Sequence, residues 1–209
     1  MLDEILTPEE RAVVARAKSF AEEHVAPHAA RWEWERRYPL ETIRAACQAN
    51  LHTIELSKKH GGQGLSFSCK LRAFEEISKH DFAFAFALIN HHNAVTRFAR
   101  DGQPAQVARL LPRMIAGEVI GCAGLSEPGV GSDFGGLEMS AVRVEGGWKL
   151  NGAKAWITNA AVAGLSVAYA QTDEAQGYRG IACFAIEADR PGFQRDKPFE
   201  LHGLSLIHI

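Results

Sequence analysis

The sequence has 209 residues, of which 46% are hydrophobic and 23% are charged. This composition is typical of a globular chain with one large or two small domains, and it excludes a disordered or collagen-like chain. The 23 Lys and Arg residues and the 25 Asp and Glu residues give a net charge of −2, so no basic excess indicates a nucleic-acid partner.

Residues 1–117 have the apolar spacing of a helical domain. A helix start is marked by Thr7 as N-cap, Pro8 at the first helical position and Glu10 closing a capping box. We expect this helix to run toward Trp32, with a disturbance at Pro27. Further helices are expected at 40–50, 68–80, 82–100 and 104–116, separated by glycine-containing breaks.

Residues 118–203 differ in composition from the helical part, because most of the 19 glycines lie after Gly117. Short segments rich in branched and aromatic residues predict strands at 140–145, 165–171 and 181–186. The Gly146-Gly147 pair between alternating segments indicates a tight hairpin. We therefore predict an α+β fold, with an all-helical domain at 1–117 followed by a small antiparallel β domain at 118–203.

The chain contains no apolar run of the roughly 20 residues that a membrane-spanning helix needs. It starts with Asp3 and Glu4 instead of the basic flank and apolar stretch of a signal peptide. We expect no membrane association and a cytoplasmic location, or the mitochondrial matrix if the chain is a processed eukaryotic protein.

Metal and disulfide sites have little support in the sequence. The four cysteines lie far apart without a C-x-x-C pair, so we expect buried free thiols. His24 and His28 have the i, i+4 spacing of helical metal ligands, but Pro27 disturbs the turn and no H-E-x-x-H pattern is present. We predict no metal.

A glycine-rich segment from Gly124 to Gly136 is the first candidate ligand loop. Closely spaced glycines let backbone N–H groups approach a ligand, and the hydroxyls of Ser126 and Ser132 can donate to phosphate or carbonyl oxygens. The segment is neither a P-loop nor a G-x-G-x-x-G fingerprint. On these residues alone, a surface turn and a ligand loop both remain open.

A second candidate segment runs from Asn151 to Asn159. It places the Trp156 ring and the Thr158 hydroxyl close together, as a flat heteroaromatic cofactor requires. The alternative is a core tryptophan beside a threonine in a strand.

The two segments together resemble a known family. C-A-G-L-S-E-P-G-V-G-S-D at 122–133 and K-A-W-I-T-N at 154–159 are similar to the flavin-binding middle domain of the acyl-CoA dehydrogenases. The helical part, with H-G-G-Q-G at 60–64, resembles the N-terminal domain of that family. The resemblance reaches about Gly203 and implies that the β domain is barrel-like.

The resemblance implies FAD as cofactor and assigns roles to single residues. Ser126 would hydrogen-bond the flavin ring, and Ser132 would lie near the pyrophosphate and the CoA thioester. Trp156 would cover the isoalloxazine on the side away from the substrate, with the Thr158 hydroxyl near its N5 edge. The implied cofactor-binding residues are Ala123, Gly124, Leu125, Ser126, Gly131, Ser132, Trp156, Ile157 and Thr158, and Ser132 is also the implied substrate contact.

The implied activity is α,β-desaturation of an acyl-CoA, in which a carboxylate removes the α-proton and the β-hydride passes to flavin N5. In the family the catalytic glutamate belongs to a further C-terminal domain, and the apolar tail at 204–209 departs from the family pattern. We therefore expect an incomplete chain that is inactive alone. No catalytic residue is assigned within it, since neither Glu127 nor Glu75 nor Glu76 suits the role of the base.

Partners implied by the family are an acyl-CoA substrate, an electron-transferring flavoprotein, and further copies of a full-length parent in a homotetramer or homodimer. Two alternatives remain: a flavin monooxygenase or nitroalkane oxidase on the same scaffold, or a non-catalytic flavin-binding or interaction protein. His91 and His92 are either a satisfied pair or a polar substrate contact. Four phenylalanines are read as helical core or as the lining of an acyl channel: Phe74, Phe82, Phe84 and Phe86.

Overall fold

The first helix begins at the capping box that the sequence predicts. In the computed structural model, which describes residues 4–196, 198–200 and 205–207, the Glu10 N–H donates to the Thr7 hydroxyl at 3.2 Å and the Thr7 N–H donates to the Glu10 carboxylate at 2.9 Å. Helix α1 (Pro8–Phe20) continues into the wider π-turn η1 (Ala21–Val25), and α2 (Ala29–Glu35) follows after a break. The expected disturbance at Pro27 is confirmed, since proline has no N–H and its ring displaces the preceding turn.

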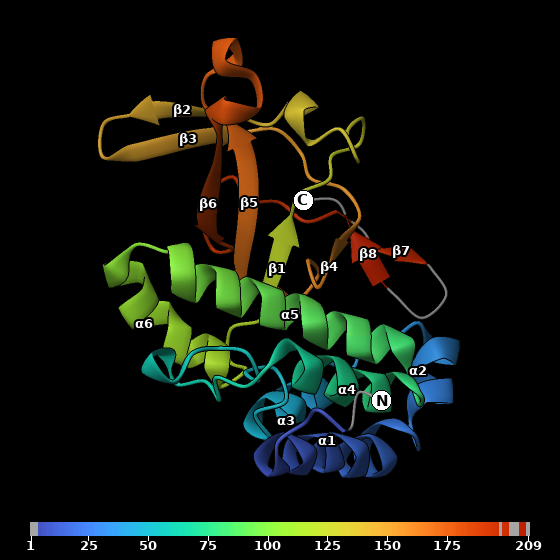
Figure 1. Ribbon diagram of the computed structural model, residues 1–209. Helices are drawn as coiled ribbons and strands as arrows, with labels where there is room; N and C mark the ends of the chain where they lie inside the picture. Colours follow the sequence, from blue (N-terminus) through green and yellow to red (C-terminus); the bar gives the residue numbers. More distant parts are fainter. Residues whose placement is uncertain (1–3, 197, 201–204, 208–209) are drawn as a thin grey trace.

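The remaining helices follow the predicted positions: α3 (Leu40–Gln48), α4 (Phe67–Ser78), α5 (Phe82–Asp101) and α6 (Pro104–Ile115), with the short turn η2 (Lys58–His60) between α3 and α4. Helix α5 starts where the Asp81 carboxylate accepts the Phe84 N–H at 3.0 Å. It lies across the top of the helical part, directly beneath the β-rich part (Figure 1). None of the helices within the described residues is both long and apolar enough to cross a membrane.

The main sheet contains β1 (Gly121–Gly124), β2 (Ser140–Val144), β3 (Gly147–Asn151), β5 (Leu165–Gln171) and β6 (Ile181–Glu187). The hairpin predicted at Gly146-Gly147 is confirmed as β2 paired antiparallel with β3, and β5 pairs antiparallel with β6. A smaller sheet has the order β4 (Ile157–Thr158), β8 (Ser205–Ile207), β7 (Phe199–Glu200). Two short 3-10 turns, η3 (Phe134–Gly136) and η4 (Glu174–Gly180), lie in the connections.

The expectation of an antiparallel, barrel-like β domain requires correction. Strand β1 pairs with β5 in parallel along its whole length, and β2 makes one parallel bridge to β5, so the sheet is mixed. Among the described residues the sheet does not close. The chain between β1 and β5 is long enough to return to the same end of the sheet, as parallel pairing requires, and apolar periodicity carries no information about that return.

Helix α5 and strand β1 join the two parts of the molecule closely. A Cβ atom on Gly121 would lie 2.6 Å from the Cβ of Ala94, so only glycine permits this approach. The Gly121 N–H donates to His91 Nδ1 at 2.9 Å, and the Asn159 amide donates to the Ala87 carbonyl at 2.8 Å. The helical part therefore fixes the position of β1 and of the two segments that follow it.

The thiols partly match the sequence prediction. Cys47, Cys69 and Cys122 are buried free thiols, whereas Cys183 is exposed. Cys183 lies on β6, whose residues are mostly half-buried, so this strand does not enclose the side chain as the interior encloses the other three.

Candidate functional site

The two sequence segments lie side by side at one edge of the β-rich part. The Ala155 N–H donates to the Ser126 carbonyl at 2.9 Å, and the Lys154 ammonium donates to the Leu125 carbonyl at 3.3 Å. These bonds connect the glycine-rich loop after β1 with the segment that leads into β4. Residues that were separate in the sequence thus form one site.

A buried ion pair reinforces this connection. Lys154 Nζ lies 2.7 Å from a carboxylate oxygen of Glu127, and both side chains are 3% exposed. The same carboxylate accepts the backbone N–H groups of Glu138 at 2.6 Å and Met139 at 3.1 Å. Burial acts to raise the pKa of Glu127, but the hydrogen bonds from Lys154 and the two amides hold that pKa below its usual value. Glu127 is therefore an ionised structural anchor of the loop.

Trp156 adopts a backbone conformation that is rare for a tryptophan. Its φ of 61° lies in the left-handed region, which costs energy in a residue with a Cβ. The consequence is that the indole is 52% exposed, and it stacks on Phe199 with ring centroids 4.6 Å apart and planes 19° apart. The alternative of a core tryptophan is wrong, because the strained turn directs the ring to the surface of the site.

The other predicted site residues divide into two groups. Gly124, Ile157 and Thr158 are buried, and Ile157 packs with Cys122 and two alanines, so its side chain serves the core. The residues at the surface or half-buried are Ala123, Leu125, Ser126, Gly131, Ser132 and Trp156. This second group gives the site an edge with an aromatic ring, two hydroxyls and exposed backbone.

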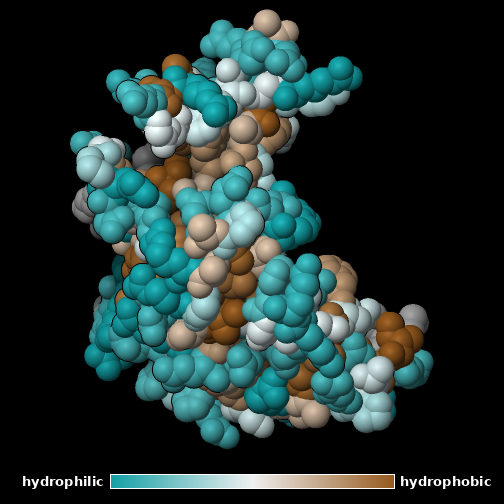
Figure 2. All heavy atoms as spheres, turned by 90° about the vertical axis from the view of Figure 1, so that its left-hand side faces the viewer, coloured by the Kyte–Doolittle hydropathy of each residue, from teal (hydrophilic) through white to brown (hydrophobic). Residues whose placement is uncertain are grey.

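A groove of about 740 Å³ borders this edge. Its walls come from the 55–60 segment, from one face of α5, and from β1 and β5, and Leu125 and Ala123 form the end next to the glycine-rich loop. The surface of the molecule is hollowed between the β-rich top and the helical base (Figure 2). The polar residues that line the groove are Glu55, Ser57, Lys59, His60, Asn90, His92, Asn93, Thr96, Arg97 and Arg100.

The His91–His92 pair is buried and internally hydrogen-bonded. His91 Nε2 lies 3.1 Å from the Met114 carbonyl, while its Nδ1 accepts the Gly121 N–H. His92 Nδ1 lies 2.7 Å from the His52 carbonyl, and its Nε2 lies 3.3 Å from Glu55. The interpretation as a satisfied pair is confirmed for both rings, and only His92 also reaches the groove.

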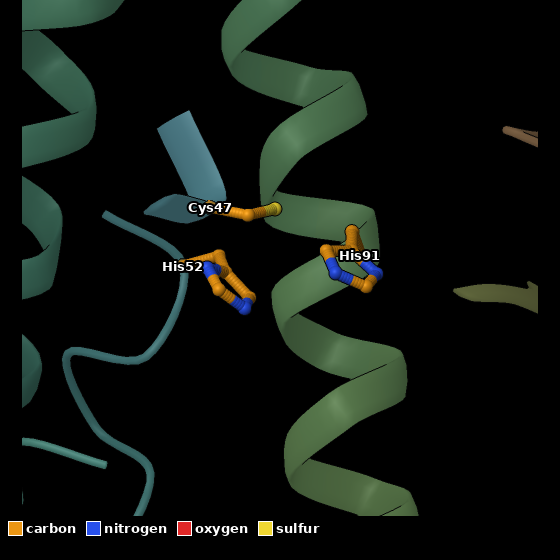
Figure 3. Close-up of side chains that lie close together, drawn as sticks. All are labelled: Cys47, His52 and His91. Atoms are coloured by element: carbon orange, nitrogen blue, oxygen red, sulfur yellow. The ribbon is translucent and has the colours of Figure 1, made fainter. Parts of the chain in front are cut away.

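A cluster that the sequence did not indicate contains Cys47, His52 and His91, whose ligand-type atoms all lie within 4.8 Å of one another (Figure 3). The geometry does not fit a metal ion. Both nitrogens of His91 already serve hydrogen bonds, and the rings of His52 and His91 are stacked with planes 15° apart, so their in-plane lone pairs do not converge. Burial also raises the pKa of the Cys47 thiol to about 12, which disfavours the thiolate that metals bind.

Neither ring nitrogen of the buried His52 has a hydrogen-bond partner in the described part of the chain. Burial sets the pKa of His52 well below its usual value and lowers that of His91 to about 4, so both rings are neutral near pH 7.

The four phenylalanines divide between core and surface. Phe74 and Phe84 are core residues, whereas Phe82 and Phe86 are exposed and stack on each other. None of the four lines the groove.

The carboxylates considered as a base have structural partners. Glu75 forms an ion pair with Arg72, and Glu76 lies 2.7 Å from Lys79 Nζ. Together with the anchoring role of Glu127, this leaves none of the three as a candidate for proton abstraction at the edge near Trp156.

Comparison with known proteins gives matches along almost the whole chain. Residues 7–118 match the family model "Acyl-CoA dehydrogenase, N-terminal domain", and residues 122–208 match "Acyl-CoA dehydrogenase, middle domain". The mitochondrial isovaleryl-CoA dehydrogenase of Oryza sativa subsp. japonica is 36% identical over 188 residues, which are 88% of this chain and 46% of that protein. The chain therefore spans about half the length of the curated relatives that it matches.

Solved structures give the same picture. Glutaryl-CoA dehydrogenase from Mycobacterium smegmatis in complex with FADH2 superposes with a TM-score of 0.90 at 28% identity, covering 99% of this chain and 53% of that one. A structure of the electron transferring flavoprotein of Acidaminococcus fermentans contains a chain with a TM-score of 0.92 at 28% identity, covering 97% of this chain and 55% of that one.

Proposed function

Since the chain belongs to the acyl-CoA dehydrogenase family, we propose that it holds FAD and an acyl-CoA thioester for α,β-desaturation. The observation that carries the proposal is the joining of the two segments at one edge, with Trp156 turned outward beside Ser126 and the glycine-rich loop. A flavin ring needs an aromatic face and hydrogen-bond donors at its periphery, and this edge offers both.

Each side chain has a separate task in this proposal. Trp156, backed by Phe199, supports one face of the isoalloxazine. Ser126 donates a hydrogen bond to the ring periphery, and Thr158, which is 7% exposed, supports the edge from within. Gly131 and Ser132 approach the pyrophosphate and the thioester through exposed backbone and a hydroxyl. When bound, FAD accepts the hydride from the β-carbon. The chain's own groups orient the two molecules and exclude water.

Proton abstraction needs a free carboxylate, and the three carboxylates that the sequence raised as candidates are engaged elsewhere. Glu127 is buried against Lys154, and Glu75 and Glu76 are paired on α4. We therefore propose that residues 1–209 alone bind flavin without desaturating a substrate, and that the base comes from outside them.

The partners proposed for the complete enzyme follow from its relatives. A solved structure of an electron transferring flavoprotein contains a similar chain, which supports such a flavoprotein as electron acceptor. Assembly into a homotetramer or homodimer remains a proposal. A location in the cytoplasm or in the mitochondrial matrix is likewise a proposal, and the mitochondrial relatives support the matrix.

The absorbance spectrum of the purified chain tests the proposal. The chain is incubated with FAD, desalted, and then mixed with a panel of acyl-CoA esters. We expect retained flavin that stays oxidised. Bleaching of the flavin by an ester would contradict the absence of a base, and complete loss of flavin on desalting would contradict FAD binding by these residues.

A further inference from the structure

We propose that the groove beside Leu125 accepts an acyl group whose far end carries a carboxylate, and that Arg97 is the residue that selects for it. This inference rests on the proposed function, since the groove borders the edge assigned to the flavin. It goes further because it names the substrate class.

One face of α5 forms the polar wall of the groove. Asn90, Asn93 and Arg97 follow one another at spacings of three and four residues, which places them on the same side of the helix. Asn93 and Arg97 are exposed and Asn90 is half-buried. The α5 wall of the groove therefore includes two amides and a guanidinium, beside the other lining residues His92, Ala94, Thr96, Ala99 and Arg100.

The opposite wall adds positive charge. Lys59 is exposed at the groove and has no ion-pair partner among residues 4–196, 198–200 and 205–207. Glu55, the acidic residue of the lining, is already engaged by the Lys70 ammonium and by His92. The groove therefore carries an excess of positive charge that a ligand can neutralise.

Arg97 retains hydrogen-bonding capacity that its neighbour Arg100 does not. Arg100 binds Asp101 with two nitrogens, each at 2.8 Å, whereas Arg97 reaches Asp101 at only 3.5 Å and lies 6.0 Å from the centre of the Tyr169 ring. A guanidinium presents parallel N–H donors that match the two oxygens of a carboxylate. Arg97 is therefore placed to bind an anionic end group.

An apolar acyl chain is a poorer match for this wall. The Asn90 amide already donates to the Phe86 carbonyl at 2.8 Å. Covering Asn93 and Arg97 with hydrocarbon, however, removes water from their donors without replacing the lost hydrogen bonds, which is costly for each group. A chain that ends in a carboxylate supplies acceptors at that place. The groove thus favours a dicarboxylic monothioester over a monocarboxylic thioester of equal length.

Matched pairs of thioesters test this inference. Calorimetric titration of the chain compares glutaryl-CoA with pentanoyl-CoA and adipyl-CoA with hexanoyl-CoA, so that each pair differs in the terminal carboxylate. We expect at least one dicarboxylic ester to bind about tenfold more tightly than its partner. Arg97→Gln should remove this preference and leave the affinity for the monocarboxylic ester unchanged.

Arg113→Gln is the matched control. Arg113 is similarly exposed and also makes one long ion pair, 3.4 Å to Glu118, but it does not line the groove. It should leave both affinities as they are, and unchanged melting temperatures exclude misfolding of either variant. Equal affinities within both pairs, an equal loss for both esters in Arg97→Gln, or binding of neither ester would overturn the inference. Flavin retention, measured on the same samples, reports on the proposed function independently.

Discussion

Two buried polar clusters in this molecule are built in opposite ways. At the candidate flavin edge, Glu127 and Lys154 satisfy each other and two backbone amides. In the helical part, His52 lies fully buried against His91 with neither of its nitrogens hydrogen-bonded in the described residues. The satisfied pair holds a loop in place at little net cost. In the second cluster His91 positions β1 through its bond to the Gly121 N–H, whereas the two nitrogens of His52 carry a cost of burial that no hydrogen bond offsets. The comparison teaches that the satisfaction of buried polar groups, more than their number, distinguishes the site from its surroundings.

The largest expected effect comes from breaking the ion pair at one end. Lys154→Met leaves the Glu127 carboxylate buried without its cation, and we expect a loss of about 3–5 kcal/mol in the free energy of unfolding. Urea denaturation measures it. Glu118→Gln, which removes an exposed ion pair at 3.4 Å, should change that free energy by less than about 1 kcal/mol. Equal effects of the two variants would show that the buried pair is not an anchor.

The pH dependence of stability tests the histidine cluster. Its folded rings are neutral because burial lowers their pKa, to about 4 for His91. In the unfolded chain the pKa of a histidine is about 6.5. Below that pH the unfolded chain binds protons that the folded chain does not bind, so the free energy of unfolding falls as the pH is lowered from about 6.5 to about 4.

The slope should reach about 1.4 kcal/mol per pH unit for each such histidine. Thermal unfolding between pH 7 and pH 5 measures it. A melting temperature that stays constant over this range would contradict neutral buried histidines.

A smaller difference in the free energy of unfolding is expected between variants of the two stacked histidines, His91 and His52. His91→Leu removes the partners of the Gly121 N–H and the Met114 carbonyl, so we expect a loss of about 1–3 kcal/mol. His52→Leu removes a ring without hydrogen bonds and should change the free energy of unfolding by less than about 1 kcal/mol, in either direction. Denaturation of both variants in parallel gives the comparison, and a larger loss for His52→Leu would show that its nitrogens have partners after all.

The helices could be predicted from the sequence because their signals are local. The capping box at Thr7 and the break at Pro27 each act within one or two turns of the chain. The parallel pairing of β1 with β5 could not be predicted, since register between distant strands depends on packing that no local pattern encodes.

The candidate site was predictable in its motifs and not in its geometry. The sequence identified Ser126 and Trp156, but no local pattern predicted the left-handed backbone at Trp156. The stacking of Phe199 on its ring joins residues 43 positions apart along the chain. The groove has the same origin, because the 55–60 segment and α5 meet only through tertiary packing. Lys154 is the first residue of the K-A-W-I-T-N motif, but no local sequence pattern indicated Glu127 as its ion-pair partner.

The central claim is that the outward-turned Trp156 and the loop anchored by Glu127 form a flavin site, and an equilibrium titration of the chain with FAD, followed by flavin fluorescence, tests it most directly. Trp148 on β3 is 42% exposed and makes an edge-to-face contact with the Phe184 ring, so Trp148→Ala is a control for Trp156→Ala that also removes an exposed tryptophan packed on a phenylalanine. We predict saturable binding that Trp156→Ala weakens at least tenfold and Trp148→Ala leaves unchanged. Equal affinities for all three proteins, or no binding by the unmodified chain, would contradict the account.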